Sequence, residues 1–269
     1  MTTVKLYIRR SIILILYLLG RFFYKSNFKK NAGKTRIIVF HHIDSNEKFD
    51  RIINRLSNKY NIISFEDWVN SNISSVSINL IISMDDGYLS WYDKAFPVFI
   101  KYNVKPLMFL STNLIDLNAD DSYHFCESKI YTWPEKSLST NQINEFIESG
   151  FFLGSHGNEH LNAIKTSSLY FERDLLSSNK ILYDKFKFTN KFFAYPFGLY
   201  KESLFPILTK NKIHYAFTCD SGFIDDSPSN YELKRTNVGM RSPLLCSAFV
   251  EGYFEYYLKI VHFIRSFKF

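Results

Sequence analysis

Short apolar runs alternate along the chain with longer segments in which apolar residues recur every three or four positions. Runs rich in Ile, Val and Phe that lack strict alternation are typical of strands buried on both faces, and the longer segments predict amphipathic helices. The predicted strands are 35–40, 61–64, 77–82, 104–110, 151–155, 192–195, 214–218 and 232–238, and the predicted helices are 46–60, 65–69, 88–102, 140–149, 167–186 and 200–211.

This order of strand, helix, strand, helix predicts an α/β protein whose parallel sheet is covered by helices on both faces. Seven or eight such units over about 220 residues are enough to close a barrel. Residues 111–137 show no period, so we expect a long loop there, and such loops are usually functional or disordered. The pattern therefore predicts one barrel domain over residues 34–245.

The two ends of the chain differ from this body. Residues 1–33 are basic and contain an apolar run, 12–20, that is shorter than the about 20 residues of a membrane-spanning helix. No small-x-small cleavage site follows the run. We interpret the segment as a helix that lies in the membrane interface, with a signal-anchor extended through residues 21–24 as the alternative. Residues 246–269 are aromatic and basic and predict a helix that contacts either the membrane or the domain.

Composition narrows the class of partner. The 269 residues carry a formal net charge of +7 and are 18% aromatic. This charge suits a membrane surface or a phospholipid-linked substrate, but the basic residues are spread along the body, which disfavours nucleic acid. Cys126, Cys219 and Cys246 lie too far apart to predict a disulfide framework or a Cys-x-x-Cys metal site. The oligomeric state is left open.

The polar residues that could take part in catalysis or metal binding follow predicted strands. Asp85 and Asp86 end the third strand, directly before Gly87, which permits a sharp turn. Two adjacent carboxylates resist joint ionisation unless a cation or a donor lies between them. Because the carboxyl ends of barrel strands meet on one face, we expect the pair to lie beside the groups that end other strands, His41 and His156.

A second candidate feature is the pair His156 and His160, four residues apart at the end of the fifth strand. Neutral imidazoles and a carboxylate are a normal ligand set for zinc and other divalent metals. Either feature alone is weak, because Asp-Asp-Gly also forms plain turns and histidines are often structural. Both features at strand ends make a metal site the better interpretation.

Three segments resemble the motifs of the polysaccharide deacetylases of the NodB-homology type, in the order that this family has them. They are residues 83–87 (Ser-Met-Asp-Asp-Gly), 154–161 (Gly-Ser-His-Gly-Asn-Glu-His-Leu) and 193–198 (Phe-Ala-Tyr-Pro-Phe-Gly), with further similarity at 40–43 and 233–238. The resemblance implies a deformed (β/α)7 barrel and hydrolysis of an acyl group from a sugar.

The resemblance also implies roles for individual residues. Asp86, His156 and His160 would bind one divalent metal ion, with zinc expected first and cobalt, nickel or manganese as alternatives. Asp85 would be the general base. The wall of the sugar pocket would consist of Tyr195, Pro196 and Phe197, and a backbone N–H near Tyr195 would hold the oxyanion.

Two departures from the family pattern affect the catalytic set. Ala194 stands where the family often has an arginine that orients the base, and we expect Arg235 to replace it from a neighbouring strand. A late Leu-x-His motif, whose imidazole is the general acid, is absent from the sequence. His41 or His42 at the end of the first strand is then the acid candidate, and a structural role for both is the alternative.

The leading hypothesis is a metal-dependent hydrolase that removes an N-acyl group, most simply N-acetyl, from a sugar of a surface polysaccharide or lipid-linked glycan. The alternative is a catalytically weak or inactive carbohydrate-binding barrel attached to the membrane, and a metal phosphoesterase is a weaker third option. The N-terminal segment predicts attachment to the bacterial inner membrane on the cytoplasmic side, with a signal-anchored extracytoplasmic protein as the alternative.

Overall fold

A computed structural model describes residues 3–22 and 27–266. The strands are β1 (Thr35–Phe40), β2 (Asn61–Ile62), β3 (Asn79–Asp86), β4 (Leu107–Leu110), β5 (Phe152–Ser155), β6 (Phe192–Ala194), β7 (Tyr215–Phe217) and β8 (Thr236–Asn237). The α-helices are α1 (Thr3–Phe22), α2 (Asn27–Lys30), α3 (Asn46–Ser57), α4 (Phe65–Val69), α5 (Phe96–Lys101), α6 (Ala119–Phe125), α7 (Thr140–Glu148), α8 (Ser168–Phe186), α9 (Phe205–Lys210), α10 (Pro243–Val250) and α11 (Tyr253–Ser266). Short 3₁₀ and π turns are η1 (Trp91–Ala95), η2 (Thr112–Leu114), η3 (Cys126–Ile130), η4 (Pro196–Gly198), η5 (Glu202–Leu204) and η6 (Ile224–Asp226).

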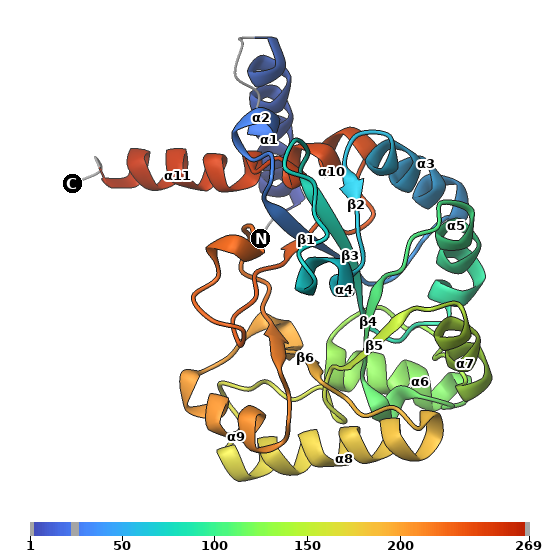
Figure 1. The fold of residues 1–269 in the computed structure, drawn as a ribbon. Helices are drawn as coiled ribbons and strands as arrows, with labels where there is room; N and C mark the ends of the chain where they lie inside the picture. Colours follow the sequence, from blue (N-terminus) through green and yellow to red (C-terminus); the bar gives the residue numbers. More distant parts are fainter. Residues whose placement is uncertain (1–2, 23–26, 267–269) are drawn as a thin grey trace.

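The strands form one curled, parallel sheet in the order β7-β6-β5-β4-β3-β1-β8, with helices around it (Figure 1). The short β2 pairs with the beginning of β3, outside this path. A parallel bridge between Phe217 and Leu233 joins β7 to the segment that leads into β8, so the curled sheet closes on itself. This arrangement confirms the predicted α/β fold with a deformed barrel.

Side chains alternate between the inside and the outside of the barrel, as neighbouring strand residues must. Ile37, Ile81 and Phe109 pack with one another in the interior cluster. Their neighbours Ile38 and Ile82 instead pack in the outer cluster that holds the covering helices. Because both faces are buried, the strands read as continuous apolar runs, which is the pattern that predicted them.

Proline explains most of the shifted element boundaries. β4 begins only at Leu107, because Pro106 before it has no N–H for the ladder. Pro97 lies in the first turn of α5 and follows the π turn η1, so the predicted helix 88–102 is divided. Pro206 likewise lies in the first turn of α9, so the prediction of one helix over 200–211 is wrong in its first half.

The segment 111–137 is more ordered than its lack of period predicted. It contains η2, α6 and η3, and the Asn118 side chain starts α6 by accepting a hydrogen bond from the backbone N–H of Asp121 at 3.0 Å. Phe125 and Cys126 anchor it in the core. The segment ends against the carboxyl face of the barrel, where it takes part in the candidate site described below.

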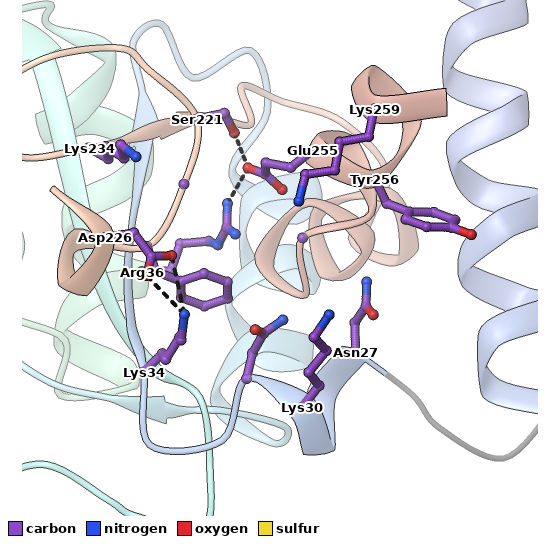
Figure 2. Close-up of a pocket in the computed structure, with 14 residues that line it drawn as sticks. Asn27, Lys30, Lys34, Arg36, Ser221, Asp226, Lys234, Glu255, Tyr256 and Lys259 are labelled. Carbon is purple, nitrogen blue, oxygen red and sulfur yellow. Dashed lines mark hydrogen bonds and ion pairs between the residues drawn. The ribbon is translucent and has the colours of Figure 1, made fainter. Parts of the chain in front are cut away.

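The C-terminal segment is two helices, and its first helix is part of the domain. All of Leu245 to Val250 is buried in α10, so the predicted domain boundary at residue 245 falls inside a core helix. α11 follows and is held by a buried ion pair in which Arg36 of β1 donates to Glu255 at 2.8 Å (Figure 2). α11 is therefore docked at its beginning and exposed further along.

The N-terminal helix α1 packs on α10 and α11 by one stripe of its surface (Figure 1). Ile13 and Tyr17 are fully buried, and the Tyr17 hydroxyl accepts hydrogen bonds from Lys59 at 2.9 Å and Arg55 at 3.1 Å. None of the helices in residues 3–22 and 27–266 is both long and apolar enough to cross a membrane. Residues 23 and 24, on which the signal-anchor alternative depends, lie outside the described residues.

Candidate active site

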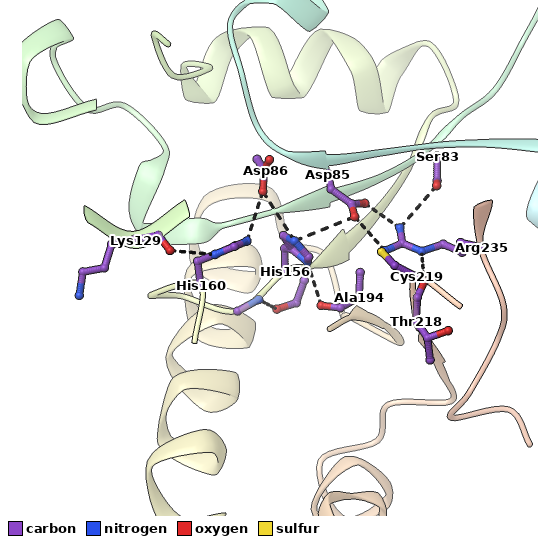
Figure 3. A network of polar contacts seen from close by, with 12 residues as sticks. Ser83, Asp85, Asp86, Lys129, His156, His160, Ala194, Thr218, Cys219 and Arg235 are labelled. Carbon is purple, nitrogen blue, oxygen red and sulfur yellow. Dashed lines mark hydrogen bonds and ion pairs between the residues drawn. The ribbon is translucent and has the colours of Figure 1, made fainter. Parts of the chain in front are cut away.

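The end of β3 places two buried carboxylates side by side. Asp85 and Asp86 are each 1% exposed. The backbone turns sharply at this point, with a φ of +92° at Asp86 and +109° at Gly87. A positive φ is costly for a residue with a Cβ, so the surrounding structure must hold Asp86 in place. The two side chains both lie near His156 but differ in their closest partners (Figure 3).

Asp86 faces both histidines of the loop after β5. Its Oδ1 atom lies 3.6 Å from Nε2 of His156 and 3.4 Å from Nε2 of His160. One ligand atom from each of these three buried residues lies within 4.8 Å of the other two. The structure thus brings together the three residues that the sequence predicted as metal ligands.

The other ring nitrogen of each histidine is held by a backbone carbonyl. Nδ1 of His156 lies 2.8 Å from the carbonyl oxygen of Ala194, and Nδ1 of His160 lies 3.2 Å from that of Lys129. A carbonyl only accepts, so Nδ1 must carry the proton in both rings. In a neutral imidazole, Nε2 then presents a lone pair toward Asp86, and neither Asp86 carboxylate oxygen has a hydrogen-bond partner among the described residues.

Electrostatics favour the same protonation states. Burial lowers the pKa of His156 to about 4, so this ring is neutral near pH 7. A buried, unpartnered anion beside two lone pairs is costly without a cation. The residues present therefore fit one divalent metal ion with two nitrogen ligands and one oxygen ligand.

Asp85 has Arg235 as its closest partner, and its Oδ2 atom also lies 4.0 Å from Nε2 of His156. The guanidinium donates two hydrogen bonds to the carboxylate, from Nη1 to Oδ1 at 2.7 Å and from Nη2 to Oδ2 at 2.8 Å (Figure 3). Arg235 is 0% exposed, and its Nε donates to the carbonyl of Thr218 at 3.0 Å. Burial would raise the pKa of Asp85, but the charge of Arg235 outweighs it, so the pKa lies below its usual value.

A cavity of about 360 Å³ opens beside these carboxylates. Its aromatic wall consists of Tyr131, whose side chain is 77% exposed, and Phe197, at 39%. Their ring centroids lie 6.0 Å apart, and the Phe197 ring also packs edge-on against His160 at 4.6 Å. The full lining is His41, His42, Asp85, Asp86, Tyr88, Ile130, Tyr131, Thr132, His156, His160, Phe197, Cys219 and Asn237.

Backbone strain is concentrated in this lining. Asp86, Tyr131, His160 and Phe197 all have a positive φ, between +51° and +92°. Such conformations cost about 1–3 kcal/mol each for residues other than glycine, and they persist where the surrounding structure fixes them, often at functional sites. The strain at these four positions supports the cavity as the functional site.

Two of the three residues predicted to form the sugar wall lie elsewhere. Tyr195 is 0% exposed, and its hydroxyl donates to the Tyr231 carbonyl at 3.0 Å. Pro196 is buried beside it, so only Phe197 reaches the cavity. The N–H of Tyr195 itself donates to the Phe217 carbonyl at 3.0 Å, so an oxyanion donor near Tyr195 would have to be another N–H. Tyr195 packs in an outer cluster with Phe193 because both belong to the face of β6 that lies against α8 and α9.

The two acid candidates lie at the rim of the cavity. His41 is partly buried and lines the cavity directly after β1. His42 is more exposed and contacts the carboxylate of Glu135, which comes from the segment 111–137. Tyr88 also lines the cavity, but burial and the Asp86 charge raise its pKa, so its hydroxyl stays protonated.

The sequence analysis missed Asp174, which holds the histidine loop. This buried carboxylate on α8 accepts hydrogen bonds from the backbone N–H groups of Asn158 at 2.9 Å and Glu159 at 2.8 Å. A Cβ at Gly157 would lie 2.7 Å from its Oδ2, so the loop passes too close for any other residue. The signal was present in the sequence, since Asp174 interrupts the apolar stripe of its helix between Phe171 and Leu175.

Comparison with known proteins identifies the family. The family described as polysaccharide deacetylase matches residues 77–216, which is just over half of the 269 residues. The chain belongs to the polysaccharide deacetylase family. The match begins just before β3 and ends in β7. It therefore contains the three candidate metal ligands and Asp85 but not Arg235.

Curated relatives match with lower coverage. The chain is 28% identical over 163 residues to the poly-β-1,6-N-acetyl-D-glucosamine N-deacetylase of Staphylococcus epidermidis, which is 57% of this chain and 52% of that protein. It is 24% identical over 176 residues to a putative polysaccharide deacetylase of Bacillus subtilis, covering 65% of this chain and 56% of that one. The chain thus spans about half the length of the curated relatives that it matches.

Solved structures share the fold of this chain. IcaB from Ammonifex degensii superposes with a TM-score of 0.67 at 19% identity, covering 82% of this chain and 98% of that one. The Streptococcus pyogenes deacetylase PplD, in complex with acetate, gives a TM-score of 0.66 at 18% identity, covering 81% and 99%. At these identities the likeness establishes the barrel and not the substrate.

The ligand set predicts how metal affinity depends on single residues. We expect His156→Ala and His160→Ala each to weaken zinc binding at least about a hundredfold. Loss of a group that only orients a ligand weakens metal binding about 10–100-fold, and loss of the ligand itself should weaken it more. The exposed His214 lies outside the cavity, so His214→Ala is the matched control. Zinc titration of chelator-treated protein measures the affinities, and equal affinities for all four proteins would refute the assignment.

Proposed function

We propose that the protein is a metal-dependent hydrolase that removes N-acetyl groups from β-1,6-linked N-acetylglucosamine polysaccharide. The observation that carries the proposal is the pairing of an unpartnered Asp86, facing two Nε2 lone pairs, with an ionised Asp85 in the same cavity. Family membership supports the reaction class. The Staphylococcus epidermidis relative supports the choice of sugar.

Each site residue has a separate role in amide hydrolysis. A divalent ion held by Asp86, His156 and His160, which we propose to be zinc, would polarise the amide carbonyl and acidify a water molecule. Asp85 accepts the proton of the attacking water at a carboxylate oxygen. Arg235 holds Asp85 in position and keeps it ionised, so it is a positioning residue.

The products are an amine and acetate, so the leaving nitrogen must gain a proton. We assign this step to His41, which lines the cavity from the end of β1 on the same face as Asp85. The exposed rings of Tyr131 and Phe197 provide flat apolar surfaces against which a sugar ring can stack. Neither ring has to move into the cavity to do so.

We further propose that α1 attaches the protein to an anionic membrane surface. Ile8, Ile12, Ile15 and Leu19 are exposed and recur every three or four residues, so they form one apolar stripe on the side of α1 opposite the buried Ile13. Lys5 is exposed on the same helix beside this stripe and suits anionic headgroups. Attachment here would hold the barrel near a glycan that is made at the membrane.

Acetate release tests the enzymatic proposal. We expect acetate from β-1,6-linked N-acetylglucosamine oligomers in the presence of zinc, cobalt or nickel. Asp85→Asn should lower kcat by about 10²–10⁴-fold, the usual contribution of a general base. Asp184→Asn, at an exposed carboxylate on α8, is the control and should match the wild type. Oligomer binding without acetate release would favour the binding-barrel alternative.

The Asp85–Arg235 pair predicts a change in pH dependence. Because Arg235 lowers the pKa of Asp85, Arg235→Gln should raise this pKa and move the acidic limb of the kcat profile to higher pH. Loss of two charge-assisted hydrogen bonds should also lower kcat at least about tenfold. Arg235→Lys keeps the charge and should shift the limb less. An acidic limb that stays in place in Arg235→Gln, with zinc still bound, would contradict the pairing role.

Vesicle sedimentation tests membrane attachment. We expect binding to vesicles of phosphatidylcholine with phosphatidylglycerol, and Ile15→Glu/Leu19→Glu should weaken it at least about tenfold, because two exposed apolar side chains become charged. Leu169→Glu/Leu176→Glu alters two leucines of similar exposure on α8 and serves as the control. Equal sedimentation of both double variants and the wild type would argue against α1 as the attachment.

A further inference from the structure

A second cavity, of about 300 Å³, lies at the amino end of β1. Its walls come from α2, the beginning of β1, the turn at residues 221–226 and α11 (Figure 2). Arg36 in this cavity precedes His41 of the candidate active site by five strand residues, or about 16 Å along β1. The two cavities therefore lie at opposite ends of the barrel, and the deacetylase proposal does not involve this one.

The lining of this cavity carries more positive than negative charge. Its carboxylates are Asp226 and Glu255; both accept hydrogen bonds, although Oε2 of Glu255 has no partner among the described residues. Asp226 accepts from Lys34 at 3.0 Å, and Glu255 accepts from Arg36 at 2.8 Å and from the hydroxyl of Ser221. Three further ammonium groups line the cavity without an ion-pair partner among the described residues; they belong to Lys30, Lys234 and Lys259.

The guanidinium of Arg36 has N–H donors without acceptors, which is a second sign of a ligand. Its side chain is 0% exposed, and Nη1 is satisfied by Thr236 at 2.7 Å and Glu255 at 2.8 Å. Nε and Nη2 have no hydrogen-bond acceptor in the described part of the chain. A buried donor without an acceptor is costly, and more so when it is charged. The guanidinium thus has donor capacity that no described residue uses.

The geometry around Arg36 keeps this donor edge in place. The guanidinium carbon lies 4.1 Å from the centroid of the Phe223 ring, which supports it by a cation–π contact. Gly252 lies beside Nη2, since a Cβ there would be in ordinary contact with it at 3.5 Å, and its φ of +86° favours glycine. Figure 2 shows the side chains of Lys30 and Lys259 extending from α2 and α11 toward the space beside this guanidinium.

We propose that this cavity binds a phosphate group. A guanidinium with two free N–H donors is matched to the paired oxygens of phosphate, and ammonium groups can neutralise the remaining oxygens from other directions. Uncompensated lysines from α2, α11 and the segment that leads into β8 suit a tetrahedral, multiply charged anion better than a flat carboxylate. The cavity has the volume of roughly ten water molecules, enough for a phosphate with part of the group attached to it.

The phosphate can belong to a phospholipid headgroup or to a soluble molecule. The position beside α1 and α11 suits a headgroup, since exposed apolar residues such as Leu19 and Phe263 occur on both helices. Binding of phosphate here does not require that α1 attach the protein to a membrane, so this inference can succeed or fail independently of that proposal.

The test is binding of inorganic phosphate to the full chain, measured by calorimetry at constant ionic strength. We expect saturable binding of one phosphate that sulfate does not match, and about tenfold weaker binding in Lys30→Gln/Lys259→Gln, since each exposed ion pair contributes up to about 1 kcal/mol. Lys191→Gln/Lys212→Gln removes two exposed lysines outside the cavity and should bind as the wild type does. Zinc affinity and acetate release should be unchanged in both double variants, which shows that they are folded.

Vesicles distinguish the two sources of phosphate. Binding to phosphatidylcholine vesicles that contain phosphatidic acid, competed by inorganic phosphate and weakened in Lys30→Gln/Lys259→Gln, identifies a lipid headgroup. Binding of inorganic phosphate without such vesicle binding identifies a soluble phosphate compound. The proposal is overturned if phosphate does not bind, or if it binds equally to the wild type and Lys30→Gln/Lys259→Gln.

Discussion

Two adjacent carboxylates at the buried end of β3 constrain the whole carboxyl face of the barrel. An uncompensated buried charge costs about 3–5 kcal/mol, so Asp85 and Asp86 must each find a partner in the folded chain. Asp85 obtains Arg235, which is 150 residues away in sequence. Asp86 lies beside two imidazoles, and a divalent cation would fit between the three side chains. The pair can be buried only if the strands that carry these groups converge.

The segment that closes the barrel supplies the partner of Asp85 and also a hydrogen-bond partner for Arg36 of β1. Arg235 points into the barrel, lies over the Phe109 ring at 5.0 Å and reaches Asp85. The next residue, Thr236, points outward and accepts a hydrogen bond from Arg36. Alternation along one short strand thus connects the candidate active site with the ion pair that docks α11. This explains how so short a strand as β8 holds the sheet closed.

Around the carboxylates, the backbone contributes as much as the side chains. Carbonyl groups of Ala194 and Lys129 orient the two histidines, and such supporting contacts raise ligand basicity and fix the ring position. Asp174 holds the loop that carries both rings by binding two of its N–H groups. The segment 111–137 provides the Lys129 carbonyl and Tyr131, so its predicted functional importance agrees with its position, although its predicted lack of structure was wrong.

The sequence by itself determined the order of strands, the two carboxylates and the two histidines, because each depends on local periodicity or on short spacing. The resemblance to the deacetylase family also suggested Arg235 as the partner of Asp85, since the family often has an arginine where Ala194 stands. Tertiary structure decided the rest. In the folded chain Tyr195 is buried and Phe197 lines the cavity. Asp174 holds the histidine loop, and Arg36 lies near three lysines. Such contacts join residues far apart in the chain and depend on the face each strand presents when the barrel closes, which no local pattern encodes.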